Sequence, residues 1–323
     1  MPETGTELLD ALDPVARDAA IERAAILIGR GDLVAFPTET VYGLGADAFN
    51  PEAIDRIYRA KGRPSDNPLI VHLASASLMN VCAVADARAL ELARHFMPGP
   101  LTLVLPARER VPLNARGGLA TVALRVPAHP VALALLSLTG PVVAPSANLS
   151  GRPSPTTANH VMSDLDGSIA AVLDGGPCRV GIESTVVDLS GASVTILRPG
   201  SIGSDEIEAV IGERLGASGR SGRVEARSPG MKYRHYAPSV PVRLHVAPAL
   251  IPAPTAGTRR MIITTFRHAG LFPGEELRPL DEHSLYRNLR EAELLGVDEI
   301  VIYAEIDEMP AGLLDRVRKA AGE

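Results

Sequence analysis

Two short runs of the chain concentrate side chains that could bind an anion. The first is Lys61–His72 (KGRPSDNPLIVH) and the second is Pro229–Pro238 (PGMKYRHYAP). Only three lysines occur among 32 basic residues, and two of them, Lys61 and Lys232, lie in these runs. A lysine is a compact point charge, whereas an arginine can hold two oxygens of a phosphate or carboxylate. We therefore interpret the two runs as parts of a site for a phosphate-bearing ligand.

Further hydroxyl, amide and guanidinium groups lie in loops that follow predicted strands. Loops carry function when a scaffold gathers them. Each group alone also has a structural explanation, such as a helix cap or a surface ion pair, but together they favour one cleft for an anionic ligand. The motifs are Pro37–Gly45 (PTETVYGLG), Thr121 with Arg125, Ser146–Ser154 (SANLSGRPS), Gly181–Thr185 (GIEST) and Leu197–Gly200 (LRPG).

The elements that position these loops can be read from caps and apolar spacing. Asn50 followed by Pro51 predicts a helix N-terminus, and that helix ends at Lys61. Asp13 followed by Pro14 predicts an earlier helix that continues to about Gly29. Apolar runs predict strands at 33–36, 69–73, 101–105, 121–126, 142–144, 170–173, 185–189 and 194–197.

Helices interrupt only some of these strands, which predicts an α/β fold: a twisted mixed sheet with flanking helices. We expect this first domain to span residues 1–215 and to close with a helix at 205–215, capped by Ser204. Residues 216–239 begin with a stretch rich in Gly, Ser and Arg and read as a linker. Residues 240–323 predict a smaller α/β domain, with strands at 240–245, 261–265 and 299–303 and helices at 284–295 and 311–321.

Composition excludes several classes of protein. A net charge of -6, no tryptophan and eleven other aromatic residues argue against a protein whose main partner is bulk nucleic acid. Neither the two cysteines nor the eight histidines show metal-ligand spacing, so we expect no metal site built by the protein. The chain has no signal peptide and no long apolar run, which indicates a cytoplasmic protein with no membrane segment. A Walker A loop is excluded, since Gly-Lys does not occur.

Four motifs together resemble the YrdC-like threonylcarbamoyl-adenylate synthases, and the run at 229–238 is similar to the two-domain form of that family. The resemblance is strong over residues 13–212 and weaker beyond 240. It implies an enzyme that joins L-threonine, bicarbonate and ATP into threonylcarbamoyl-AMP and releases pyrophosphate, with Mg²⁺ accompanying ATP. The product would feed a downstream threonylcarbamoyl-transferase complex that modifies adenosine in tRNA. The motifs are PTETVYGLG from Pro37, KxRP with NPLIVH from Lys61, PSANxSG from Pro145 and GIESTVVD from Gly181.

By motif position, the resemblance implies two sets of binding residues. Threonine would be held by Thr40, His72, Arg125, Ala144 and Ser184, with Arg125 on the carboxylate. The residues implied for ATP are Lys61, Arg63, Asn67, Thr121, Ser146, Asn148, Ser154, Arg198 and Tyr236. Lys61, Arg63 and Arg125 would be the catalytic residues, acting by positioning and by neutralising charge. The reaction needs no covalent enzyme intermediate, because a carbamate oxygen attacks the α-phosphate directly.

The segment Pro229–Pro238 places five polar residues in a row after a flexible linker, which indicates a lid over the first domain with Tyr236 on the nucleotide. An anchor for the second domain is the alternative. Two other functions remain open: an RNA-binding module that uses a basic cleft, and a carbamoyl-transfer enzyme of hydrogenase maturation. RNA binding is expected to be weak or absent, and no paired CxxC supports the second alternative.

Overall fold

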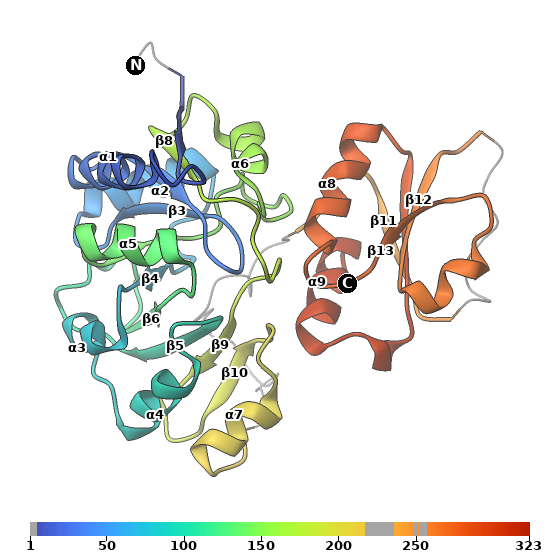
Figure 1. Cartoon of the computed structure of the whole chain (residues 1–323). Coiled ribbons are helices and arrows are strands. Elements are labelled where there is room, and N and C mark those ends of the chain that lie inside the picture. The colour runs from blue at the N-terminus through green and yellow to red at the C-terminus, as the bar shows by residue number, and fades with distance from the viewer. Residues whose placement is uncertain (1–4, 217–235, 248–250, 252–256) are drawn as a thin grey trace.

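The computed structural model describes residues 5–216, 236–247, 251 and 257–323. Two sheets form the framework (Figure 1). The first has ten strands in the order β1-β8-β2-β3-β7-β4-β6-β5-β9-β10. Its strands are β1 Glu7–Asp10, β2 Val34–Phe36, β3 Gly43–Asp47, β4 Ile70–His72, β5 Leu101–Pro106, β6 Thr121–Arg125, β7 Val142–Val143, β8 Ala171–Asp174, β9 Thr185–Asp188 and β10 Thr195–Arg198.

Parallel and antiparallel pairs alternate irregularly across this sheet, which confirms the predicted mixed α/β fold. Both faces are covered by helices. On β2, Ala35 packs into one apolar cluster while Val34 and Phe36 pack into another, as alternation along a strand requires. The flanking helices are α1 Arg17–Gly29, α2 Pro51–Lys61, α3 Met79–Cys82, α4 Ala87–Phe96, α5 Pro130–Thr139, α6 Ala158–Leu165 and α7 Ser204–Ile211.

Several element boundaries differ from the sequence prediction. Helix α1 begins at Arg17, after a turn in which Asp13 Oδ1 accepts a hydrogen bond from the Val15 amide. The N-cap of α7 is Gly203 rather than Ser204. Strand β3 was not predicted because it contains two glycines. A Cβ at Gly45 would lie 2.9 Å from the Phe36 ring, so the neighbouring strand requires glycine there.

The second sheet is parallel throughout, in the order β11-β14-β12-β13. Helices α8 and α9 cover the face of the second sheet that is turned toward the first sheet (Figure 1). We call residues 5–216 the N-terminal part and the described residues from 236 onward the C-terminal part. The elements are β11 Val242–His245, β12 Arg260–Thr264, β13 Glu276–Pro279, β14 Glu299–Tyr303, α8 Leu285–Leu295, α9 Ala311–Ala321 and the short 3₁₀ helices Ala76–Leu78, Phe266–Leu271 and Ile306–Glu308.

The two parts share an apolar cluster. Val41 and Ile182 of the N-terminal part pack into the same cluster as Leu285 and Leu313. The backbones also touch, because a Cβ at Gly312 would lie 2.7 Å from the Gly200 carbonyl oxygen. Most of the predicted linker, residues 217–235, lies outside the described residues, so the division into domains at 215 and 240 stays a prediction.

Cys82 and Cys178 are both buried and unpaired. Among the residues that the structure describes, none of the helices combines the length and apolar character that a membrane span requires.

Candidate functional site

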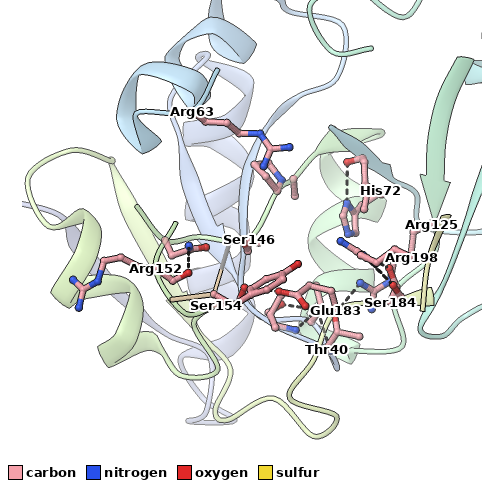
Figure 2. Close-up of a pocket in the computed structure, with 18 residues that line it drawn as sticks. Thr40, Arg63, His72, Arg125, Ser146, Arg152, Ser154, Glu183, Ser184 and Arg198 are labelled. Atoms are coloured by element: carbon pink, nitrogen blue, oxygen red, sulfur yellow. Dashed lines mark hydrogen bonds between the residues drawn. The ribbon is translucent and has the colours of Figure 1, made fainter. Parts of the chain in front are cut away.

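A polar pocket opens at strand ends of the N-terminal part (Figure 2). It has about 620 Å³ of empty space, which includes space open to solvent. Four arginines, one histidine and several hydroxyl groups line it. The lining residues are Thr38, Thr40, Val41, Gly43, Arg63, Ile70, His72, Arg125, Ala144, Pro145, Ser146, Asn148, Arg152, Ser154, Glu183, Ser184, Arg198 and Tyr236.

His72 and Arg125 lie side by side because they end two neighbouring parallel strands, β4 and β6, in matching register. Arg125 is buried and held from three sides. Its Nε donates to the Gly99 carbonyl at 3.3 Å, its Nη1 donates to Thr40 Oγ1 at 2.8 Å, and its Nη2 lies 2.7 Å from Glu39 Oε1. A guanidinium has five N–H donors, more than these contacts use. Arg125 can therefore offer donors to a ligand while its own position stays fixed.

His72 is neutral at working pH. Burial, with a further contribution from the Arg125 charge, lowers the pKa of His72 to about 3. Its Nδ1 lies 3.2 Å from the Ile70 carbonyl oxygen, which makes Nδ1 the protonated nitrogen of the neutral ring. The ring can then accept a hydrogen bond at Nε2 without adding charge to the pocket.

The turn after β2 supplies Thr40 and fixes it locally. Thr38 Oγ1 donates to the Val41 carbonyl at 2.6 Å and accepts from the Thr40 amide at 3.2 Å. Glu39 points the other way along the turn, where its carboxylate also accepts from the Ala128 amide at 2.9 Å. Burial would raise the pKa of Glu39, but the Arg125 charge and these hydrogen bonds lower it overall, so the pair is ionised.

Helix α2 ends next to the pocket and positions Lys61 and Arg63. The predicted N-cap is confirmed, since Asn50 Oδ1 accepts from the Glu52 and Ala53 amides at 3.1 Å. The helix ends at Gly62, whose φ of 60° is in the left-handed region that favours glycine. This sharp end lets the side chains on either side of it point into the fold.

Lys61 does not reach the pocket. Its Nζ donates to the carbonyl oxygens of Ser146 and Asn148, both at 2.5 Å. Burial, with the neighbouring Arg63 charge, lowers the pKa of Lys61 well below its usual value. Lys61 therefore fixes the loop that presents Ser146 and Asn148, and its predicted direct contact with phosphate stays a prediction.

Arg63 and Arg198 reach the pocket from different sides, Arg63 from the end of α2 (Figure 2). Arg63 donates to the carbonyls of Asn67 and Pro68 at 3.3 and 3.1 Å, and burial lowers its pKa to about 10. Arg198 donates to the Ser184 carbonyl from Nε and Nη2 at 3.1 and 3.0 Å. Within the described parts of the chain, neither guanidinium has a carboxylate at ion-pair distance. Arg198 Nη2 also donates to Ser184 Oγ at 3.1 Å. A buried cation held only by uncharged acceptors is suited to receive an anion.

Several buried polar atoms near these cations also lack a protein partner. Among the described residues, both amide atoms of Asn67, Oδ1 of Asn148 and Nε of Arg63 have no hydrogen-bond partner. Such groups are rare in folded proteins and are explained when a ligand completes them. Of these residues, Arg63 and Asn148 line the pocket, and Asn67 contacts Arg63 through its carbonyl.

Glu183 is the second buried carboxylate of the pocket. Its Oε1 accepts from Ser154 Oγ at 2.5 Å, and its Oε2 accepts from Tyr286 and Arg316 of the C-terminal part. Burial would raise the pKa of Glu183, but the Arg316 and Arg198 charges and these hydrogen bonds lower it to about 2. Glu183 is therefore ionised, and both of its carboxylate oxygens accept hydrogen bonds.

The structure brings most of the expected residues together. Eleven of the fourteen implied binding residues line the pocket; the exceptions are Lys61, Asn67 and Thr121. Thr121 begins β6 and lies at the opposite end of that strand from Arg125. Ser146, Asn148 and Ser154 lie on one loop, and Tyr236 is buried beside them, although the rest of the proposed lid, residues 229–235, lies outside the described residues.

Sequence reasoning assigned no role to Glu183 or Arg152, which also line the pocket, or to Glu39, which pairs with the pocket-lining Arg125. Both carboxylates lay within quoted motifs, but their arginine partners are far away in the sequence. Arg316, for example, is 133 residues from Glu183. The available signal was an acidic residue placed between hydroxyl residues in a motif otherwise suited to anions.

Comparisons with known proteins place this geometry in a family. A family model described as telomere recombination, covering Sua5, YciO and YrdC, matches residues 27–200. A second, described as the C-terminal domain of threonylcarbamoyl-AMP synthase, matches residues 202–322. The chain is 46% identical to the threonylcarbamoyl-AMP synthase of Pyrococcus abyssi, over 94% of each chain. It is 43% identical to that of Bacillus subtilis, over 97% of this chain and 96% of the relative.

A solved structure agrees with these matches. The crystal structure of P. abyssi Sua5 complexed with L-threonine aligns with a TM-score of 0.87 and 42% identity, over 98% of both chains. The likeness thus covers both sheets and the pocket between strand ends. The chain belongs to the threonylcarbamoyl-AMP synthase family.

Proposed function

We propose that this protein is a nucleotidyltransferase that makes threonylcarbamoyl-AMP from L-threonine, bicarbonate and ATP, releasing pyrophosphate and water. The observation that carries the proposal is the pair of buried arginines, Arg63 and Arg198, that face one pocket without a carboxylate partner in the described residues. Burying two such cations is costly unless an anion joins them. A triphosphate supplies that anion, and Asn148, which also lines the pocket, has a buried amide oxygen without a partner in the described residues.

The second subsite is suited to an amino acid with a hydroxyl group. Arg125 is positioned to donate to the substrate carboxylate, and neutral His72 and buried Ser184 offer hydrogen bonds to the amine or the hydroxyl. Because Glu39 pairs with Arg125, the guanidinium stays oriented when no substrate is present. Ala144 contributes backbone, and its amide already donates to the Ile70 carbonyl at 2.9 Å, so its carbonyl is the group left for the substrate.

The chemistry follows from holding the two substrates together. Threonine's amine has a pKa of roughly 8, so a usable fraction is neutral and captures carbon dioxide from bicarbonate as a carbamate. A carbamate oxygen then attacks the α-phosphorus, the bond to the β,γ-diphosphate breaks, and pyrophosphate leaves. Arg63 and Arg198 would stabilise charge on the phosphates, while Lys61 would act indirectly, by fixing the Ser146–Asn148 loop.

Mg²⁺ would arrive with ATP as part of the substrate. Both pocket carboxylates are engaged by arginines, and within the described residues no three acidic, histidine or cysteine side chains form a group that could hold a metal ion. Mg²⁺ commonly keeps several waters and is bound largely through substrate phosphates. The residues present therefore fit a magnesium–nucleotide complex better than a resident metal.

The product would pass to a threonylcarbamoyl-transferase complex for tRNA modification. We place the reaction in the cytoplasm, which suits two buried, unpaired cysteines. RNA binding by this protein is expected to be weak, since the net charge of the chain is -6.

Mass spectrometry tests the proposed function directly. Wild-type protein incubated with ATP, L-threonine and ¹³C-bicarbonate should form threonylcarbamoyl-AMP that carries the label, together with pyrophosphate. Arg63→Met should lower the rate by about a hundredfold or more, because one charge-stabilising group at the phosphates is lost. Arg59→Met is the matched control, since Arg59 is exposed on the same helix, and should stay within about twofold of the wild type.

Two outcomes would contradict the assignment. If the wild type makes no labelled product, the function is wrong. If Arg63→Met and Arg59→Met behave alike while both remain folded by circular dichroism, the phosphate subsite is wrong. Tight RNA binding with a steep salt dependence, in place of product formation, would favour the RNA-binding alternative.

A further inference from the structure

Helices α8 and α9 of the C-terminal part send two side chains to the edge of the pocket. Tyr286 and Arg316 are both fully buried, with 0% of each residue exposed. Tyr286 Oη donates to Glu183 Oε2 at 2.9 Å, and Arg316 Nε donates to the same oxygen at 2.7 Å. The other carboxylate oxygen of Glu183 accepts from Ser154 Oγ. One carboxylate thus links both C-terminal helices to a pocket-lining hydroxyl.

The same two side chains also hold Tyr236. The rings of Tyr236 and Tyr286 stack with centroids 5.4 Å apart and planes at 29°, and the Arg316 guanidinium lies 5.3 Å from the Tyr236 ring centroid. Tyr236 has a φ of 65°, a conformation that is costly for a residue with a side chain. A guanidinium over one aromatic ring and a second ring stacked on it are attractive contacts that can offset this cost.

Arg316 makes a third connection, to the segment that carries Arg198. Its Nη1 donates to the Pro199 carbonyl at 2.9 Å. Glu183 directly precedes Ser184, whose carbonyl receives both hydrogen bonds from Arg198. Arg316 therefore contacts Pro199, which follows Arg198 in the chain, and Glu183, which precedes the residue that Arg198 binds.

We propose that Tyr286 and Arg316 are positioning residues for the nucleotide side of the pocket, acting through Glu183 on Ser154 and through direct contact on Tyr236. The inference rests on the proposed function, because it assumes that this side of the pocket binds ATP. It gives the C-terminal part a role in the reaction: the nucleotide subsite is complete only when α8 and α9 are docked.

A purely structural role is the competing explanation. Buried ion pairs are weak evidence for stability, and this interface has others, such as Arg290 with Asp164 at 2.7 Å. That pair does not line the pocket, whereas Glu183 does. A structural role would lower stability and affect both substrates alike. A positioning role would weaken nucleotide binding and spare threonine, whose predicted ligands Arg125 and His72 do not contact this network.

Tyr286→Phe separates the two explanations, because it removes one hydroxyl and keeps the ring that stacks on Tyr236. Calorimetry with an ATP analogue that has a methylene bridge between its α and β phosphorus atoms should show roughly tenfold weaker binding, since a hydrogen bond to a charged group is lost. The Kd for L-threonine should stay within about twofold. Tyr303→Phe is the matched control: Tyr303 is a buried tyrosine on β14 of the same C-terminal part, its hydroxyl has no hydrogen-bond partner in the described residues, and neither Kd should change.

A double-mutant cycle with Ser154→Ala tests the route through Glu183. Each single variant should weaken analogue binding by some factor. If Tyr286 acts through Glu183 on Ser154, the double variant should weaken binding by clearly less than the product of the two single-variant factors. Arg316→Lys, which keeps the charge, should bind the analogue better than Arg316→Met.

Three results would contradict the proposal. Unchanged analogue affinity in Tyr286→Phe, equal losses for both substrates, or fully multiplicative losses with Ser154→Ala would each overturn it. The mass-spectrometric assay reports separately on the proposed function. A wild type that forms labelled product alongside an unaffected Tyr286→Phe would refute the positioning role alone. A wild type without product, but with analogue binding that depends on Tyr286, would refute the function alone.

Discussion

The proposed threonine subsite contains three buried polar side chains. Thr40, His72 and Ser184 are almost completely inaccessible to solvent, and His72 carries no charge at neutral pH. A hydroxyl in the substrate can use the remaining hydrogen-bonding capacity of these groups, such as the acceptor nitrogen of His72, whereas a methyl of the same size cannot. The cost of unpaired buried polar groups exceeds the gain from an extra apolar contact.

We therefore predict that valine is rejected far more strongly than serine. Serine lacks one methyl group and should lose roughly 10- to 200-fold in kcat/KM, whereas valine should lose roughly 10⁴-fold. Pyrophosphate release with each amino acid measures both ratios. In Thr40→Val, which removes one hydroxyl from the pocket, the discrimination against valine should shrink. Valine and serine used equally well by the wild type would show that the threonine subsite is misassigned.

At the scale of elements, α2 shows how much the local sequence determines. Asn50, Pro51 and Gly62 set both ends of the helix, and all three features were readable before the structure was known. The predicted strands of the first sheet were also confirmed. Strand β3 and helix α5 were not predicted, because a strand that contains glycine and a short helix that is apolar on most sides lack a clear periodic signal. Helices α4 and α6 were also missed, although each has polar and apolar residues on opposite faces.

The Asn50 cap should stabilise the protein without taking part in binding. Asn50→Ala removes the acceptor for two backbone amides and should lower the free energy of unfolding by about 1 kcal/mol in urea denaturation. The KM for ATP should not change, because Lys61 and Arg63 lie at the far end of the helix. Asn80→Ala, at an exposed position of α3, should stay within roughly 0.5 kcal/mol of the wild type. Equal effects of the two changes would argue against the cap.

At the scale of the whole molecule, the contacts between the two parts lay beyond sequence reasoning. Arg316 sits in an amphipathic helix with other charged residues, and nothing in its local sequence separates it from solvated neighbours. Its partner Glu183 becomes evident only when both sheets are in place. Single motifs thus predicted the pocket's cations and hydroxyls, but not the carboxylates that orient them.

The Glu183 pair should make stability depend on acid pH. The pKa of Glu183 falls from an ordinary 4.5 to about 2 in the folded protein. A lowered pKa means that its stabilising contribution is complete above pH 4.5 and is lost as the pH falls from there to about 2. The difference of about 2.5 between the two pKa values corresponds to roughly 3 kcal/mol.

Comparison with Glu183→Gln isolates this contribution from that of other carboxylates. Urea denaturation at stepped pH should show the wild type more stable than the variant near neutral pH. The difference in free energy of unfolding should then shrink by roughly 3 kcal/mol between about pH 4.5 and 2. A difference that stays constant across this range would mean that Glu183 is not held ionised by Arg316.

The strand order of the first sheet also governs when the site can form during synthesis. Strand β8 lies between β1 and β2, and β5 lies between β6 and β9. A nascent chain that ends before Asp174 therefore leaves both β1 and β2 without their shared neighbour, although each was made more than a hundred residues earlier. Contacts of such large sequence separation slow folding, because long loops must close first. The turn that carries Thr40 is thus anchored only after most of the N-terminal part has emerged, so the binding pocket is one of the last features of this part to become ordered.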